Sequence, residues 1–184
     1  MRLLVLALFA LAPLRAQSLG AFEASTDVGI TSRPGKAEYD SKTGAYRITA
    51  SGHNMWGVKD AFHFVYRKHR GDISISTEVE WVGEGKTAHR KGGPLFRATL
   101  DEDSPYADFI FHGSGELAIQ YRKTKGGPTE QITTSIRPPA IARLERHGNV
   151  ISAEIAKPGQ PFQPAGALTI EMPDAIYAGL ALCS

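Results

Sequence analysis

The stretch ISISTEVEW, residues 73–81, decides the fold class. Its β-branched or apolar positions, which alternate with serines and glutamates, are Ile73, Ile75, Thr77, Val79 and Trp81. Successive side chains of a β-strand point to opposite faces, so this alternation predicts a strand with one buried face and one face in water. A helix would instead repeat its apolar positions every three or four residues.

The same period recurs along most of the chain, with turn-forming residues between the runs. Examples are AYRITAS, DAFHFVY, GPLFRATL, ELAIQYR and NVISAEI, separated by turns such as KTG, GEGK, DEDSP and KGGP. After residue 16, no segment of helical length keeps an apolar stripe. Many short strands with Gly and Pro turns predict an all-β protein, built as an antiparallel sandwich or barrel.

Residues 1–16, MRLLVLALFALAPLRA, read as a secretory signal peptide. A cation at Arg2 precedes an apolar run, and Ala16 stands before the polar Gln17. The run is too short to span a bilayer, so no membrane span is predicted and the protein is expected to be secreted or periplasmic. Residues 17–184 then form one domain.

Charge and cysteine content exclude some functions. Removing the signal takes away two of the 21 basic residues, and the remaining 19 equal the 19 acidic residues. A neutral chain lacks the electrostatic footprint of phosphate binding, so no nucleic acid partner is expected. Cys183 is the only cysteine, which excludes a disulfide within the chain. Its apolar setting, YAGLALC, predicts a buried thiol and not a nucleophile.

The order of several segments carries a family resemblance. These segments are GAFEASTDVG, GKAEYD, YRITASGHNMWGVKDAFHFVY, GDISISTEVEW, HRKGGPLFRATLDEDSPYAD, LAIQYR, ARLERHGN and YAGLALCS. Together they resemble secreted bacterial concanavalin A-like sandwich domains of the DUF1349 type, which occur alone or fused to TolB-like propeller repeats and carbohydrate-active modules. The resemblance implies a two-sheet antiparallel jelly-roll sandwich whose curved face often handles sugars, and it implies no particular reaction. KPGQPF stands where the family has a Ser-Asp-Gly-Trp turn, which removes an aromatic ring from that place.

A candidate binding face comes from the strand DAFHFVY. Alternation places His63 opposite its phenylalanines, and we expect Arg97 and Gln120 to join it on one concave surface if their strands are neighbours. The side chains expected on the opposite, buried side are Phe62, Phe64, Phe96, Ile119 and Tyr121. Imidazole, guanidinium and amide groups offer a hydroxyl-rich ligand both donors and acceptors. The alternative is a purely structural role.

Trp56 and Asp60 complete the ligand-binding candidates. They belong to the turn and strand start within SGHNMWGVKDAFHFVYRK, residues 51–68. The Trp56 indole offers a stacking surface for a sugar ring. In the alternative interpretation Trp56 caps the edge of the core.

Two function classes stay open. The first is a non-catalytic carbohydrate-binding or accessory module with a polysaccharide or glycan ligand. The second is a glycoside hydrolase that uses Glu78 and Glu80, whose Cα atoms would lie roughly 7 Å apart on one strand face, within the range of glycosidase carboxylate pairs. Because EVEWVGE lacks the intervening aspartate of sandwich-fold glucanases, a solvated strand face is the favoured interpretation and no catalytic residue is predicted.

No cofactor is predicted, although calcium has weak candidate ligands in LDEDSPYAD. Asp101, Glu102, Asp103 and Asp108 bring oxygen atoms close together in sequence. Acidic residues before Ser-Pro are also ordinary turn formers. The six histidines form no HxxxH or HExxH motif, so zinc has little support.

The C-terminal segment predicts a missing strand. IYAGLALCS reads as a strand, and Ser184 follows it without the turn residues that end the earlier strands. The related domains continue with one more apolar strand. We therefore expect this chain to lack its final strand and to leave an exposed sheet edge or groove beside its first strands.

Overall fold

The computed structural model describes residues 18–83 and 87–184, and every regular element in them is a β-strand. No helix in these residues is long and apolar enough to cross a bilayer. The signal peptide predicted at residues 1–16 lies outside the described residues, so it stays a prediction.

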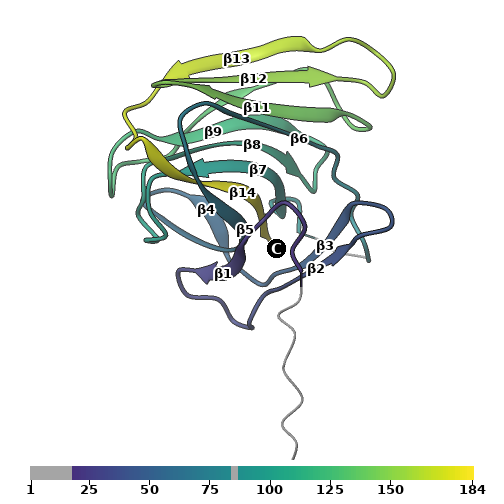
Figure 1. The fold of residues 1–184 in the computed structure, drawn as a ribbon, viewed down its shortest axis with the longest axis horizontal. Helices are drawn as coiled ribbons and strands as arrows, with labels where there is room; N and C mark the ends of the chain where they lie inside the picture. Colours follow the sequence, from purple (N-terminus) through teal and green to yellow (C-terminus); the bar gives the residue numbers. More distant parts are fainter. Residues whose placement is uncertain (1–17, 84–86) are drawn as a thin grey trace, which may run out of the picture.

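The strands form a large sheet, a small sheet and a separate two-stranded sheet, and all strand pairs are antiparallel (Figure 1). The large sheet runs in the order β1 (Ala24–Val28), β5 (Lys59–Arg70), β14 (Ala175–Cys183), β7 (Lys91–Arg97), β8 (Tyr106–His112), β9 (Leu117–Arg122) and β10 (Glu130–Thr133), and β4 (Asn54–Trp56) pairs with β5. The small sheet runs β13 (Gln163–Thr169), β12 (Val150–Ala156), β11 (Ile141–His147) and β6 (Ile73–Thr77). The two-stranded sheet consists of β2 (Lys36–Asp40) and β3 (Ala45–Thr49).

The two sheets stack face to face around the main hydrophobic core. Buried side chains of the large sheet meet those of the small sheet there, among them Phe96, Phe109, Ile119, Leu144 and Ile155. This arrangement confirms the predicted all-β fold, a two-sheet antiparallel sandwich.

The stretch that predicted the fold behaves as its alternation indicates. Residues 73–77 form β6, and the alternation of half-buried and exposed side chains continues beyond the strand to Trp81. Ile73, Ile75, Val79 and Trp81 pack against the core between the sheets.

A second apolar cluster lies on the opposite face of the large sheet. It contains Phe62, Phe64, Leu95, Tyr106 and Ile110. Met55 of β4 belongs to this cluster, and Asp60 at the start of β5 pairs with Arg122 on the same face. The hairpin of β4 and the start of β5 therefore lies over this face, which we call the hairpin-covered face. The large sheet therefore buries apolar side chains on both of its faces. Alternation alone cannot tell which of the two clusters a given side chain joins.

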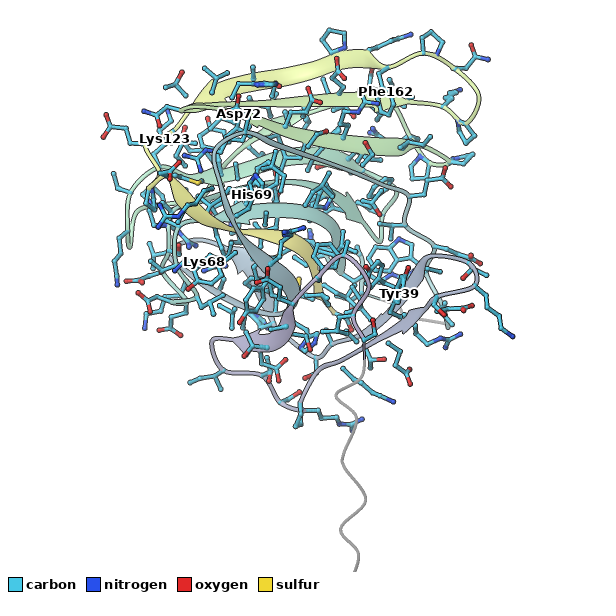
Figure 2. The ribbon with its side chains drawn as sticks, viewed as in Figure 1. Tyr39, Lys68, His69, Asp72, Lys123 and Phe162 are labelled. Carbon is cyan, nitrogen blue, oxygen red and sulfur yellow. The ribbon has the colours of Figure 1, made fainter. Side chains whose placement is uncertain are left out.

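The basic run at residues 67–70 occupies the far end of β5, where Figure 2 labels Lys68 and His69 at the surface. His69 hydrogen-bonds the backbone oxygen of Asp72, and Arg70 pairs with Asp174 at 2.9 Å. The run is a solvated strand end whose charges are partly paired within the protein.

β14 lies between β5 and β7 and pairs with both. The edges of the large sheet are β1 and β10. The strand expected beyond Ser184 is not tested by this arrangement and stays a prediction.

Replacing Leu144 by alanine should lower the free energy of unfolding by about 2–5 kcal/mol, because it opens a cavity in a closed core. Leu144 is completely buried between the sheets. Val150 on the neighbouring strand β12 is 45% exposed, so Val150→Ala is the matched control and should cost less than about 0.5 kcal/mol. Urea unfolding of both variants measures the difference; equal losses would contradict this assignment of the core.

Candidate functional site

The hairpin that crosses the large sheet builds the candidate site. Met55 pairs with Asp60, and both side chains are buried against the sheet. Gly57 adopts a positive φ of 68° in the turn, which glycine reaches without strain. Its carbonyl oxygen accepts hydrogen bonds from the Thr129 backbone N–H and from the Arg122 guanidinium. The turn is thereby fastened to β9 and to the residue before β10.

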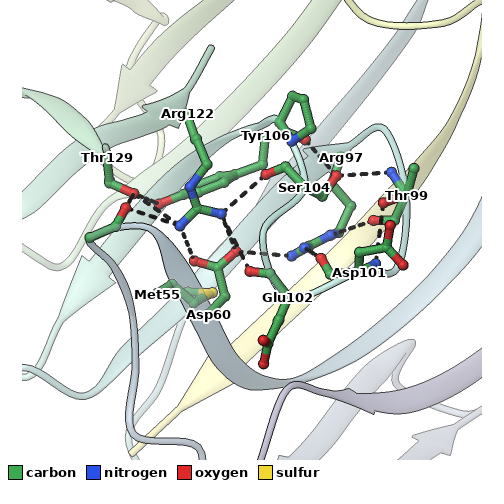
Figure 3. Close-up of polar contacts among 12 residues, drawn as sticks. Met55, Asp60, Arg97, Thr99, Asp101, Glu102, Ser104, Tyr106, Arg122 and Thr129 are labelled. Carbon is green, nitrogen blue, oxygen red and sulfur yellow. Dashed lines mark hydrogen bonds and ion pairs between the residues drawn. The ribbon is translucent and has the colours of Figure 1, made fainter. Parts of the chain in front are cut away.

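Asp60 anchors the hairpin through a buried ionic network (Figure 3). Its Oδ1 accepts from Arg122 Nη2 at 2.7 Å, and its Oδ2 accepts from Arg122 Nη1 at 2.8 Å. Arg97 Nη1 lies 3.5 Å from the same Oδ2. Burial raises the pKa of the Asp60 carboxyl group, so these two guanidinium groups are what favours its ionised form.

The two arginines also hold the loop between β7 and β8. Arg97 donates to the backbone oxygens of Thr99 and Asp101, and Arg122 donates to that of Ser104 at 3.1 Å. The Asp60 N–H donates to the Glu102 oxygen at 2.8 Å. Burial acts to lower the pKa of Arg122, but its bond to Asp60 outweighs burial and the net pKa is raised. The network thus fixes the hairpin and the loop to one another.

A groove of about 410 Å³ lies where these two elements meet. It is lined by Ile30, His53, Asn54, Trp56, Lys59, Asp60, Ala61 and Glu102. Trp56 is 41% exposed. Directly paired residues of an antiparallel ladder share a face, so Trp56 projects with Lys59 and Asn54 projects with Ala61. Since Asn54 and Trp56 are two residues apart, all four side chains belong to one face of the hairpin.

A buried cation supports the Trp56 ring. The Lys91 Nζ atom lies 5.2 Å from the ring centroid and donates to the Met55 oxygen at 3.0 Å. Burial lowers the pKa of Lys91, and nearby Asp108 acts against this effect. The cation–π contact helps to hold the indole in one position while part of the ring stays in contact with solvent.

The prediction that His63 shares a concave face with Arg97 and Gln120 is wrong. Arg97 and Gln120 do lie on one face, the hairpin-covered face, but each is only 1% exposed. His63 pairs with Leu182 and points to the opposite face, whereas Phe62 and Phe64 belong to the cluster on the face of Arg97. Phe96 and Ile119 lie in the core between the sheets, so the expected buried row is divided between two faces.

His63 instead forms a cross-strand pair with Asp27 of β1. His63 Nδ1 lies 2.8 Å from Asp27 Oδ1, and the Gly35 N–H donates to the same carboxylate. A Cβ atom at residue 35 would come within 2.2 Å of His63 Nδ1, so only glycine fits there. The pair fastens the segment that follows β1, and neither side chain lines the groove.

The predicted calcium ligands do not form one site. Asp101 and Asp103 both face Lys125, at 2.7 and 3.6 Å, while Asp108 is buried on β8 and accepts from the Gln120 backbone N–H. Across the described residues, no group of three or more His, Cys, Asp or Glu side chains could hold a metal ion.

Glu78 and Glu80 follow β6, and both are exposed. They lie on the solvent side of the segment whose Val79 and Trp81 pack on the core. This placement agrees with the solvated-face interpretation.

Several important residues were not among the predicted site residues. Arg122 follows Gln120 at the alternate position of one strand, so its face could have been inferred, but its partner Asp60 is remote in sequence. The groove residues Ile30 and Asn54 come from separate segments and carry no local signal, and Glu102 was a candidate for calcium only.

Comparisons with known proteins support the fold and little more. No protein-family model and no curated protein matches the sequence. A solved structure from Saccharomyces cerevisiae, described as a functionally unknown protein, is similar with a TM-score of 0.56 and 11% identity, covering 87% of this chain and 86% of that one. Lectin I-B4 from Griffonia simplicifolia, in a metal-free form, is similar over 88% of this chain and 85% of its own, with 9% identity and a TM-score of 0.47. The yeast protein shows a shared fold, and the lectin likeness is too low to support an argument.

Asp60→Asn should destabilise the protein by about 3–5 kcal/mol, because it leaves the buried Arg122 guanidinium without a counter-charge. Cys183 lies in the same apolar cluster as Met55 of the hairpin, and burial raises the pKa of its thiol to about 11. Exposure of this thiol therefore measures whether the hairpin has loosened. Thermal unfolding and labelling of Cys183 by a thiol reagent measure the effect, and labelling should become faster in the variant. Lys125→Ala breaks only exposed ion pairs and is the control. Unchanged stability of Asp60→Asn would refute the anchoring role.

Asp27→Asn should remove part of the acid sensitivity of folding. Burial acts to raise the pKa of Asp27, but hydrogen bonds from Gly35 and His63 outweigh it and the net pKa is lowered from 3.8. A carboxyl group with a lowered folded-state pKa stabilises the fold above its unfolded pKa, and this contribution disappears as the pH falls through the folded value. Wild type should therefore exceed the variant in stability at neutral pH and lose that advantage below about pH 4. Denaturation over a pH series tests this, with Glu171→Gln as an exposed control.

Proposed function

We propose that this protein is an exported carbohydrate-binding or accessory module and that it binds its ligand in the groove beside Trp56. The observation that carries the proposal is the half-exposed indole of Trp56 within a groove of about 410 Å³ that also contains amide, ammonium and carboxylate groups. Aromatic rings offer apolar faces to the C–H groups of sugars, and the polar groups around them bind hydroxyls.

The rigidity of the groove supports this function. Its walls are the hairpin and the loop after β7, and the Asp60 network bonds both of them. Lys59 and Glu102 form an ion pair between the two walls. A site held in its bound geometry loses little conformational entropy when a ligand arrives.

The proposed site, the groove beside Trp56, is not the site that the resemblance to DUF1349-type domains implies. In those domains the curved sheet face often handles sugars, whereas here the hairpin covers the face that carries Arg97 and Gln120. Membership of that family remains part of the proposal, as does export through the predicted signal peptide. The proposal assigns no catalytic role to Glu78 and Glu80, which are exposed and do not line the groove.

Trp56→Ala should weaken glycan binding about fivefold or more, since one stacked ring contributes about 1 kcal/mol or more. Residues 17–184 would be applied to a glycan array and then titrated with each positive glycan, and reducing-sugar release would be measured on the same panel. Val58→Ala changes an exposed residue of the same hairpin turn and is the matched control. Binding that does not depend on Trp56, or steady sugar release, would refute a non-catalytic site at this groove.

A further inference from the structure

We propose that the groove beside Trp56 accepts a neutral pyranose ring with adjacent hydroxyl groups and that the Lys59–Glu102 ion pair excludes anionic sugars. This inference rests on the proposed function and names the ligand class of the same site.

The lysine and the two carboxylates that line the groove are paired within the protein. The Lys59 ammonium contacts Glu102 Oε1, and the Asp60 carboxylate is bonded by Arg122. Lysine is protonated near neutral pH, and the bond to Glu102 raises the pKa of Lys59 further. An anionic sugar that contacts Lys59 would bring its own carboxylate close to the Glu102 carboxylate, which already holds that ammonium. The like-charge contact disfavours acidic ligands.

The Asn54 amide supplies the polar recognition. Its side chain lines the groove and makes no hydrogen bond to any described residue, and its Oδ1 atom is buried without a partner. A carboxamide carries a donor and an acceptor side by side, which matches two neighbouring hydroxyl groups of a sugar ring. Ala61, its partner across the hairpin, is small and lines the same groove.

The indole of Trp56 supplies the apolar contact. Lys91 lies over the ring at 5.2 Å, and Trp56 lines the groove and is partly exposed. A ring held in this way favours a flat, uncharged ligand face such as the C–H face of a pyranose. The groove thus combines the Asn54 amide, the Trp56 indole and the paired charges of Lys59 and Glu102. This combination suits a neutral, hydroxylated ring.

The test compares neutral and anionic oligosaccharides of matched length. Gluco-, manno- and xylo-oligosaccharides are titrated into residues 17–184 by calorimetry, and oligogalacturonate is titrated in parallel at low and physiological salt. We expect wild type to bind at least one neutral series and not oligogalacturonate. Asn54→Ala should weaken neutral binding about tenfold, because a ligand hydrogen bond is lost.

Glu102→Gln is the decisive variant, because it frees Lys59 without changing the shape of the side chain. It should gain measurable oligogalacturonate binding, and added salt should weaken this gain. Asp103→Asn removes the same charge from the same loop outside the groove lining, where Asp103 pairs with Lys125 and not with Lys59, and should gain much less. Preferential oligogalacturonate binding by wild type, or unchanged neutral binding by Asn54→Ala, would overturn this inference while Trp56-dependent sugar binding kept the proposed function. Binding of neither class would overturn both.

Discussion

The ion pair between Asp60 and Arg122 is the interaction on which the candidate site depends. Asp60 stands near the start of β5, and Arg122 ends β9, on the far side of the face that the hairpin crosses. An unpaired buried charge is strongly unfavourable, so the hairpin must lie where its carboxylate meets the guanidinium. Arg97 lies on the same face and bonds the loop whose residue Glu102 forms the other wall of the groove.

This constraint changes what the second face of the large sheet can do. Met55 and Asp60 fill it from within the chain, so Arg97 and Gln120 lie beneath the hairpin and cannot contact a ligand while the hairpin stays in place. The outward side of the same hairpin presents Trp56 to solvent instead, and the half-buried Asn54 lies on the same side. The exposed surface on this side of the protein is therefore the outer side of the β4–β5 hairpin and not the sheet beneath it.

Alternation in the sequence predicted the strands and the all-β class, because both depend on local side-chain periodicity. It could not assign faces, because the large sheet is apolar on both sides: Phe96 packs between the sheets and Phe62 packs under the hairpin. The error on His63 follows from this, since the residue alternates correctly with Phe62 but the two faces were exchanged. Contacts such as Asp27–His63 depend on strand register and chain topology, which one sequence does not specify. Trp56 was named from the chemistry of an indole beside a turn. The structure places it at the groove, and its role toward a ligand stays a prediction.

A buried ionic network is not needed for stability as such, since well-packed apolar side chains often stabilise a core equally well. What arginine adds is geometry. Its planar group carries five N–H donors in a fixed arrangement, and Arg122 uses them on one carboxylate and on carbonyl oxygens of both walls. Leucine or methionine would fill the space but would leave the Ser104 oxygen without this donor and the Gly57 oxygen with Thr129 alone. Lysine would lack the second, parallel bond to Asp60. The positions of Gly57 and Ser104, and with them the separation of the groove walls, are thus specified by hydrogen bonds that only a guanidinium group can make together.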